Sequence, residues 1–421
     1  RPFFARKANK CLAFVDAAVS AQLGLDCASR EELLQSLSHG SGPKDLSCTA
    51  AVKDSHLLEL CISAGVTIAI DNFYELSAVD ALLGKGDVSV QLALRMSGFI
   101  HEGEKLHSRF GFDVDQFPEL LSYLKDHPSS LRCIAGLHFH LDGYCSSQRV
   151  SAIRQLASLV SSLRGLGEPV SFLDIGGGFP VCYLRNEADW VRFWKEHELA
   201  LTRKRGEVTY LNNPLGRIVQ DDRVLGASEA YPFYQQPTRE AWLAEILDTE
   251  TDGLCIARQL TALDLELRCQ PGRCLLDDTG LTIARVESIK PLPHGEAAVL
   301  LAMNGTQCRT SSADFFVDPL LIKREDGDAQ FNLPEVKSGY LFGAYCTESD
   351  LIIKRKLVFE QGIGIGDLIV LPNTAGYFMH FLESRSHQFP LAKNVVYNPE
   401  SSKTLHLDGI DQMRGETIQE S

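Results

Sequence analysis

Short apolar segments alternate with longer amphipathic segments over roughly the first two thirds of the chain. The apolar segments have the length of β-strands, and the segments between them repeat apolar positions at helical spacing. Strands are predicted at residues 2–6, 25–28, 46–50, 66–70, 88–96, 134–140, 170–175 and 265–270. Helices are predicted between them, for example at 31–38, 56–64, 148–166 and 239–263. Eight such units favour a closed (β/α)8 barrel around a parallel sheet.

The pattern changes near residue 285. Strand-like runs at 284–289, 298–303, 367–371 and 395–397 are separated by Gly, Pro and Asp, without a long helix. We therefore predict a barrel domain over residues 1–284 and a β domain over residues 285–421. The polar, aromatic-rich stretch from about 182 to 237 is predicted to be an insertion that covers the barrel mouth.

The composition excludes several classes of partner. The chain has 421 residues, of which 44% are apolar and 23% charged, enough for two domains with buried cores. Its net charge of −14 argues against nucleic-acid binding, which needs clustered Lys and Arg. No apolar run reaches the roughly 18 residues of a membrane span, and the 12 cysteines show neither disulfide-framework nor metal-site spacing. We expect a cytoplasmic enzyme that binds no metal ion and no membrane.

Reactive side chains follow the ends of the predicted strands. In (β/α)8 barrels the chemistry lies at the carboxyl ends of the strands, where the following loops meet. Lys7, Asp26, Arg95, His140 and Gln270 all fall at or just past such an end, as do Lys53 and Asp71. Desolvation would favour the neutral amine of Lys7, which can attack an aldehyde carbonyl to form a Schiff base. Taken alone, an ordinary surface lysine is the commoner interpretation.

Two turns have the composition of phosphate-binding loops. The glycine triplet Gly176 to Gly178 would expose backbone N–H groups, although such triplets also serve as simple tight turns. The sequence Gln270-Pro271-Gly272-Arg273 offers a further turn with an arginine.

In combination these motifs resemble a known family. The motifs lie in order along nearly the whole chain: residues 5–9 (ARKAN), 26–33 (DCASREEL), 108–111 (SRFG), 136–140 (GLHFH), 173–179 (LDIGGGF), 270–273 (QPGR), 343–350 (GAYCTESD) and 375–377 (AGY). The chain thereby resembles the ornithine, diaminopimelate and arginine decarboxylases, which are pyridoxal-phosphate (PLP) enzymes with an alanine-racemase-like barrel.

The resemblance implies a PLP-binding (β/α)8 TIM barrel followed by a C-terminal β-sandwich domain. It also implies a homodimer whose active site is shared across the interface. In that family the sandwich takes further strands from before the lysine. We therefore expect amino-terminal strands of this domain to be missing from the chain.

The resemblance also implies roles for individual residues. Lys7 would hold PLP as a Schiff base, His140 would stack on the cofactor ring, and Cys346 of the second subunit would donate a proton. The cofactor pocket would comprise Asp26, Glu32, Arg95, Gly176, Gly177, Gly178, Gln270, Gly272, Arg273 and Tyr377. The substrate would be bound by Thr347, Asp350 and Arg309.

Three positions depart from the family pattern. Family members usually have Glu in place of Gln270, and a neutral amide cannot by its charge keep the cofactor's pyridine nitrogen protonated. Glu266 is not expected to replace it, because four residues of strand separate them by roughly 13 Å. Thr347 stands where related enzymes have an acidic residue, and Leu141-Asp142-Gly143 replaces a small glycine–serine pair. These changes predict a weaker electron sink and a nonstandard, larger substrate.

We therefore predict a PLP-dependent decarboxylase that removes the α-carboxylate of an amino acid or amino-acid conjugate. One alternative is an amino-acid racemase or epimerase on the same fold, which a weak electron sink would favour. The other is a regulatory homologue with little catalytic activity, which Gln270 keeps open.

Overall fold

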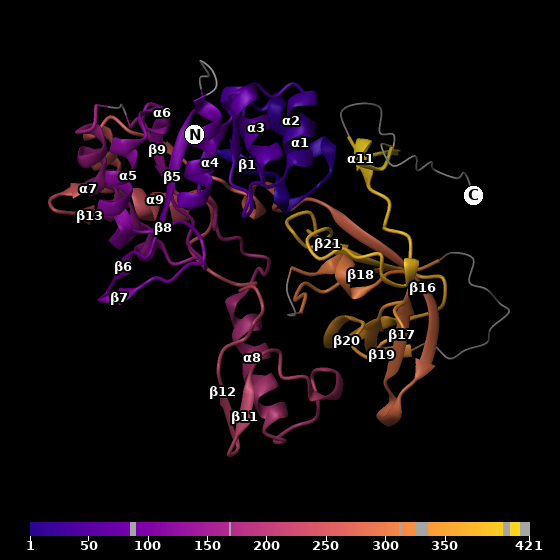
Figure 1. Ribbon diagram of the computed structural model, residues 1–421. Coiled ribbons are helices and arrows are strands. Elements are labelled where there is room, and N and C mark those ends of the chain that lie inside the picture. Colours follow the sequence, from indigo (N-terminus) through magenta and orange to yellow (C-terminus); the bar gives the residue numbers. More distant parts are fainter. Residues whose placement is uncertain (85–89, 168–169, 311–313, 325–335, 399–404, 413–421) are drawn as a thin grey trace. The chain divides into compact units, whose positions relative to one another are not determined.

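The computed structural model describes residues 1–84, 90–167, 170–310, 314–324, 336–398 and 405–412. The chain forms two compact units, which are described separately (Figure 1). The first comprises residues 1–180, 237–275 and 395–421, and the second comprises residues 181–236 and 276–394.

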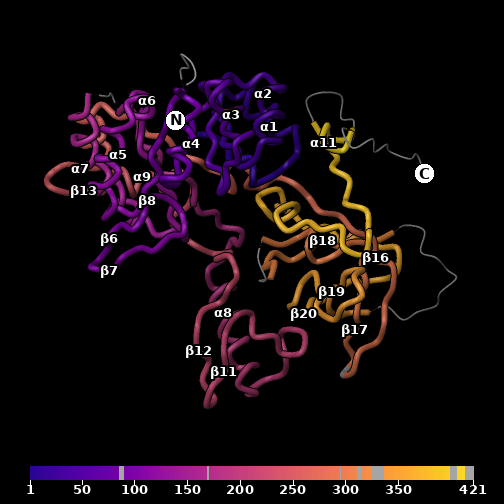
Figure 2. The backbone as a smooth tube through the Cα atoms, in the orientation of Figure 1, coloured from indigo at the N-terminus to yellow at the C-terminus, as the bar shows by residue number. Residues whose placement is uncertain are grey.

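The first unit contains a parallel barrel (Figure 2). Its strands follow the order β1 (Phe3–Ala5), β2 (Gly24–Cys27), β3 (Leu46–Cys48), β4 (Thr67–Ile70), β5 (Leu92–Ser97), β9 (Ile134–His138), β10 (Phe172–Asp174) and β15 (Glu266–Arg268). A parallel bridge between Pro2 and Cys269 joins the last strand to the first, and the Phe3 N–H donates to the Cys269 carbonyl at 2.8 Å. The predicted (β/α)8 barrel is confirmed, and each predicted strand overlaps an observed one. Residues 88 and 89 of the fifth predicted strand lie outside the described residues.

The barrel strands are apolar because both faces of the sheet are covered. β1, β2, β4 and β5 are buried along their whole length, as expected for a parallel sheet between helices and a filled interior. Gly136 makes room for an aromatic ring, since a Cβ there would lie 2.3 Å from the ring of Phe172.

Helices connect the barrel strands. They are α1 (Leu12–Ser20), α2 (Arg30–Ser38), α3 (Ser55–Ala64), α4 (Phe73–Leu83), α5 (Phe117–Asp126), α6 (Pro128–Leu131), α7 (Ser146–Arg164), α9 (Arg239–Asp248) and α10 (Ile256–Ala262). Ser29, Asp54 and Asn72 cap α2, α3 and α4, each accepting a backbone N–H near the helix start. The short strands β6 (Ile100–His101) and β7 (Glu104–Lys105) form a hairpin, and β8 (Phe112–Asp113) pairs with β5.

The prediction of a single helix over residues 239–263 is wrong in the middle of this range. α9 ends at Asp248, and a hairpin of β13 (Glu250–Thr251) and β14 (Leu254–Cys255) precedes α10. The turn residues Asp252 and Gly253 have φ of 55° and 82°. This Asp-Gly turn signal outweighs the helical periodicity around it.

The end of the chain belongs to the barrel unit. The strands β22 (Val395–Tyr397) and β23 (Leu405–Leu407) pair with each other, and α11 (Gly409–Gln412) follows. The buried carboxylate of Asp408 accepts the backbone N–H groups of Leu12 and Ala13, both at 2.9 Å, and so caps α1. The compact units therefore divide the chain differently from the predicted β-domain range of 285–421.

The second unit contains a mixed sheet. Its strands follow the order β18 (Leu320–Ile322), β21 (Leu368–Pro372), β16 (Leu281–Pro291), β17 (Ala297–Leu301), β19 (Val336–Phe342) and β20 (Leu351–Ile363). Neighbouring strands are antiparallel except β17 and β19, and register shifts interrupt the β16–β17 and β19–β20 pairs. The predicted carboxyl-terminal β domain is confirmed.

The insertion packs on this β domain. It contains α8 (Glu187–Leu201) and a hairpin of β11 (Ile218–Gln220) and β12 (Arg223–Leu225). The rings of Trp190, Phe193 and Trp194 lie 5.0 to 5.5 Å from that of Phe316. These contacts explain why the segment falls in the second unit, and its predicted role in covering the barrel mouth stays a prediction.

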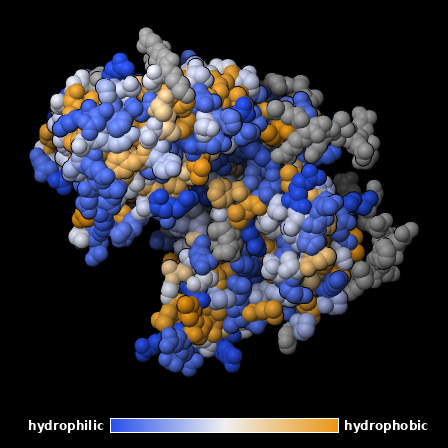
Figure 3. Space-filling view, in the orientation of Figure 1, coloured by the Kyte–Doolittle hydropathy of each residue, from blue (hydrophilic) through white to orange (hydrophobic). Residues whose placement is uncertain are grey.

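Apolar side chains also gather on the outside of the insertion, seen in orange at the lower edge of Figure 3. They include Leu211, Ile218, Val219 and Leu225, all exposed. None of the helices within the described ranges has the length and apolar character needed to cross a bilayer.

Candidate active site

Lys7 lies immediately after β1, in the one-turn helix η1 (Arg6–Ala8). The residues of β1 are buried, whereas the side chain of Lys7 is exposed. The Ala5 N–H donates to the Pro271 carbonyl at 3.1 Å, which fixes the end of this strand against the segment after β15. The strand end therefore presents an amine at the carboxyl edge of the barrel.

Asp26 lies one strand away, near the end of β2, and is buried. The Thr49 hydroxyl lies 2.8 and 2.9 Å from its two carboxylate oxygens. Burial raises the pKa of Asp26 to about 7, although the positive charge of Lys7 and the Thr49 hydrogen bond act in the opposite direction. Asp26 can therefore take up or release a proton near neutral pH.

Glu32 has a structural function at the start of α2. Its carboxylate accepts the Ala28 N–H at 2.7 Å, and the Ser29 hydroxyl accepts the Glu32 N–H at 3.2 Å. The pair has the Ser-x-x-Glu spacing of a capping box, but the Glu32 carboxylate accepts the N–H of Ala28, one residue before the Ser29 N-cap. Burial raises the pKa of Glu32.

Arg95 is held inside the site by the loop that carries the SRFG motif. Its guanidinium lies 3.2 Å from the Asp71 carboxylate and 4.3 Å from the centre of the Phe110 ring. Asp71 also accepts the Gly111 N–H at 3.1 Å. A Cβ on Gly111, whose φ is +77°, would lie 2.8 Å from the Arg95 carbonyl, so the loop can close this tightly only with glycine.

A buried ion pair lies beside this group. Lys53 Nζ lies 3.0 and 3.2 Å from the Glu75 carboxylate oxygens and 2.9 Å from the Ala50 carbonyl. The side chains of Lys53 and Glu75 are only 0% and 8% exposed. Glu75 also accepts the Asp71 N–H at 2.9 Å at the start of α4. The sequence placed Lys53 and Asp71 at strand ends, but it gave no partner for Lys53.

His140 follows β9 as a neutral ring. Its Nδ1 accepts the Gly177 N–H at 3.1 Å. Burial lowers the pKa of His140 to about 3, and the charges of Lys7, Arg95 and Arg149 act in the same direction. The imidazole is therefore uncharged at any physiological pH and links the end of β9 to the glycine triplet.

The glycine triplet has a backbone that other residues would disturb. Gly176 and Gly178 have φ of +66° and +87°. A Cβ would lie 2.6 Å from the Phe139 carbonyl at Gly176 and 2.7 Å from the Gln270 carbonyl at Gly177. The Gly176 N–H is donated to Asp174 at 2.8 Å and the Gly177 N–H to His140. These two glycines therefore allow a close approach of the backbone but donate their N–H groups within the protein.

Gln270 is tied to a carboxylate that the sequence did not single out. Its Nε2 donates to Asp174 at 3.0 Å, and both side chains are buried. Burial raises the pKa of Asp174 to about 6, against the hydrogen bonds from Gly176 and Gln270. Glu266 is exposed and pairs with Arg268 at 2.7 Å, which agrees with the expectation that it does not replace the missing carboxylate.

We expect Gln270→Glu to make the stability of the protein strongly pH-dependent. The new carboxyl group would lie within hydrogen-bonding distance of Asp174 in a buried site, so the two would share a proton and their folded-state pKa values would rise. A raised carboxyl pKa stabilises the fold below the unfolded value of about 4, and this contribution is lost as pH rises through the folded value. The melting temperature, measured between about pH 5 and pH 8, should fall more steeply than that of the wild type.

The control for this substitution exchanges the two groups. In Asp174→Asn with Gln270→Glu, the amide and the carboxylate change places and only one carboxyl remains. The double variant should regain the pH profile of the wild type. Equal profiles for the single variant and the wild type would show that position 270 does not interact with Asp174.

Gly272 and Arg273 lie in the turn after β15, where Arg273 begins the short helix η5 (Arg273–Leu276). Burial raises the pKa of Tyr144, and the positive charge of Arg273 and its hydrogen bond oppose this shift. Arg273 and Tyr144 therefore lie side by side next to the loop that follows His140.

The remaining predicted residues lie in the second unit. Cys346 and Thr347 are exposed at the tip of a loop, whereas Asp350 at its base is buried. The Asp350 carboxylate accepts the N–H groups of Gly305 at 2.7 Å and Tyr345 at 2.8 Å, and the Arg309 guanidinium donates to the Leu351 carbonyl. Asp350 and Arg309 thus brace the loop that presents the Cys346 thiol, and their predicted substrate contacts stay predictions.

Tyr377, predicted to contact the cofactor phosphate, is half-buried with a φ of +72°. Its ring lies 5.6 Å from that of Phe381. The turn around Tyr377 is therefore fixed within its own unit.

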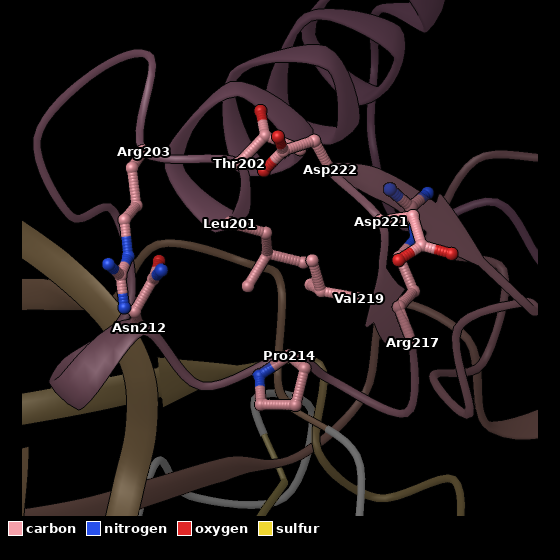
Figure 4. A pocket seen from close by; sticks show the side chains of 9 residues that line it. All are labelled: Leu201, Thr202, Arg203, Asn212, Pro214, Arg217, Val219, Asp221 and Asp222. Atoms are coloured by element: carbon pink, nitrogen blue, oxygen red, sulfur yellow. The ribbon is translucent and has the colours of Figure 1, made fainter.

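The insertion carries an open hollow of about 600 Å³ that contains none of the predicted site residues. Arg203 and Asn212 lie on one side of it and Arg217 and Asp221 on the other, with Leu201 between them (Figure 4). Arg217 stacks on Trp194 at 4.3 Å, so this hollow belongs to the packing of the insertion.

Comparison with known proteins shows the family to which the chain belongs. The family model described as the pyridoxal-dependent decarboxylase, pyridoxal binding domain, matches residues 1–204. An uncharacterized protein of Sinorhizobium fredii is 30% identical over 98% of this chain and 85% of its own length. Diaminopimelate decarboxylase of Synechocystis is 30% identical over 44% of this chain, and the match spans 42% of that protein.

The fold is also that of a solved decarboxylase. Diaminopimelate decarboxylase of Helicobacter pylori, solved in complex with L-lysine, superposes with a TM-score of 0.67 at 16% identity, over 98% of this chain and 88% of that one. The chain belongs to the family of pyridoxal-dependent ornithine, diaminopimelate and arginine decarboxylases, as a divergent member. Pyridoxal phosphate is its cofactor, and its enzyme class is that of the carboxy-lyases.

Proposed function

We propose that this protein removes the α-carboxylate of an amino acid or amino-acid conjugate, with pyridoxal phosphate held covalently by Lys7. The observation that carries the proposal is the group at the carboxyl edge of the barrel. There an exposed lysine lies near a buried carboxyl of Asp26, whose pKa is about 7, and a neutral His140, whose pKa is about 3. A lysine with a purely structural role would not need a buried carboxyl group and a neutral imidazole beside it.

The protein residues have separate tasks in this reaction. The cofactor, when bound, supplies the electron sink for the pair left behind as carbon dioxide departs. His140 offers an uncharged ring fixed through Nδ1 by the Gly177 N–H. Asp26 can exchange a proton near neutral pH beside the positive charge of Lys7. The glycine triplet lets the backbone approach the cofactor phosphate closely, and Arg273 would add positive charge to the phosphate site.

Cys346 is proposed as the proton donor to Cα, supplied by the second subunit of a homodimer. Its exposure at a braced loop tip supports this role, because the thiol is accessible while the base of the loop is fixed by Asp350. Thr347 beside it carries no charge. The proposed substrate therefore lacks the distal ammonium group that an acidic residue at this position would bind, and a conjugated or otherwise larger amino acid fits better.

The proposal is tested by carbon dioxide release from a panel of L-, D- and conjugated amino acids, measured with the purified protein and PLP. Deuterium exchange at Cα is followed in the same samples. We expect at least one larger substrate to lose its carboxylate. If no substrate does so while Cα exchange proceeds, the protein is a racemase or epimerase.

A further inference from the structure

Arg149 is a fully buried arginine that forms no ion pair within the described residues. It lies in the first turn of α7, and its side chain is 0% exposed. Its guanidinium donates to three neutral carbonyls, those of Leu141 at 2.9 Å, Gly143 at 2.6 Å and Cys145 at 3.2 Å. Its Nε has no hydrogen-bond partner. In the part of the chain that the structure describes, no carboxylate lies within ion-pairing distance of it.

A buried guanidinium without an ion-pair partner is energetically unfavourable unless an anion binds close to it. Burial disfavours a charge that is not paired, and most buried arginines contact a carboxylate or a phosphate. The same burial lowers the pKa of Arg149 to about 10, against the charges of Cys145, Tyr144 and Asp142. Asp142 is exposed and forms no ion pair with Arg149. Neutral carbonyl groups accept hydrogen bonds from its two terminal nitrogens but do not balance its charge.

The guanidinium lies against the glycine triplet. A Cβ built on Gly178 would be 2.5 Å from Arg149 Nη2. The Trp242 ring lies 5.4 Å from the guanidinium carbon, and the Trp242 indole N–H donates to the Tyr144 carbonyl at 2.8 Å. The indole thus helps hold Arg149 beneath the triplet.

The loop that Arg149 braces is the one in which this chain departs from its family. Leu141, Asp142 and Gly143 provide no side-chain hydroxyl next to the triplet. The N–H groups of Gly176 and Gly177 are donated within the protein. Apart from the proposed contribution of Arg273, a phosphate dianion at the triplet would be stabilised by positive charge held close to these glycines.

We propose that Arg149 is a cofactor-positioning residue that supplies this charge, so that the phosphate of the cofactor is the missing counter-ion of its guanidinium. The proposal rests on the proposed function and adds a residue to it. Arg149 would attract the phosphate by its positive charge and would hold the loop of residues 141–145 in place. Its effect should therefore be specific to a ligand that carries a phosphate. Arginine is suited to this task because it stays protonated and holds several carbonyl groups at once.

The test compares the affinities of the protein for PLP and for pyridoxal, which lacks the phosphate. Both are measured by absorbance titration of the protein freed of cofactor. Arg149→Met should weaken PLP binding about 10- to 100-fold, the contribution of a charge-assisted contact, and leave pyridoxal binding unchanged. Arg149→Lys, which keeps the charge, should restore most of the preference for PLP.

The matched control lies at the other end of the same helix. Arg164 also donates to a backbone carbonyl, that of Val170 at 2.6 Å, but it does not contact the triplet. Arg164→Met should leave both affinities unchanged. Unchanged pyridoxal binding by Arg149→Met shows that this variant is folded.

The outcomes separate this inference from the proposed function. Equal losses for PLP and pyridoxal, or no loss for either, would overturn the role of Arg149 while leaving the proposed function intact. Wild-type protein that binds neither compound would contradict the proposed function. In that case, inorganic phosphate could still be used to test for an anion site. If phosphate stabilises the wild type against heat but not Arg149→Met, an anion site at Arg149 is supported. If phosphate does not stabilise the wild type, an anion site is refuted.

Discussion

Replacing Lys7 with alanine is expected to abolish covalent attachment of PLP and to lower carbon dioxide release by about 10⁴-fold or more, the loss typical of removing a nucleophile. The proposed role of Lys7 requires its amine, which is exposed at the barrel edge, to bond to the cofactor aldehyde. The measurement is borohydride reduction of the protein with PLP, followed by mass spectrometry of the peptides. The wild type should carry one reduced adduct, on Lys7, and the variant none.

Lys10→Ala provides the matched control, because it removes a lysine three residues further along the same segment. This variant should keep both the adduct and the activity. An adduct on a lysine other than Lys7 in the wild type would disprove the assignment, and so would full activity of Lys7→Ala.

The largest loss of stability is expected from Lys53→Met. This change leaves the Glu75 carboxylate buried without its cation and removes the bonds to both of its oxygens. Breaking one side of a buried ion pair costs about 3 to 5 kcal/mol, because the remaining charge is uncompensated. Urea denaturation followed by far-UV circular dichroism measures the change. The exposed pair Arg192–Asp189 is the control, and Arg192→Met should cost less than about 1 kcal/mol.

A double-mutant cycle separates the pair from its surroundings. In Lys53→Met with Glu75→Gln, no charge is left at the site and the amide oxygen can still accept the Asp71 N–H. The double variant should be more stable than the sum of the two single changes predicts, by about 2 kcal/mol or more. Additive losses would mean that Lys53 and Glu75 do not stabilise one another.

The barrel was predictable because its signals are local. Most of the strands are short apolar runs that are buried on both faces. Some helix starts also carry their own side-chain cap, such as Ser29 for α2 and Asn72 for α4. The break between α9 and α10 was missed because the helical spacing of apolar residues continues across Asp252 and Gly253. The Asp252-Gly253 dipeptide was the sequence signal for the turn, and both residues have positive φ in the structure.

The site was predictable only in part. The order of motifs placed Lys7, Asp26, His140 and the glycine triplet at strand ends, and the structure has them there. Four residues of the site were missed: Thr49, Glu75, Asp174 and Arg149. Each contacts a residue that is distant in the sequence, or a loop whose path the sequence does not determine. A pattern can show that a residue follows a strand, but not which side chain it meets.

The sequence by itself determined the family, the cofactor and the succession of strands, because motif order and apolar periodicity are properties of the chain alone. Only the tertiary structure decided the charges of the site. Closing the barrel removes Asp26, Asp174 and Arg149 from water and brings partners to the first two, while Arg149 meets only neutral carbonyls. Burial and the hydrogen-bonding partner together determine whether such a group is charged, and both arise only when the barrel folds.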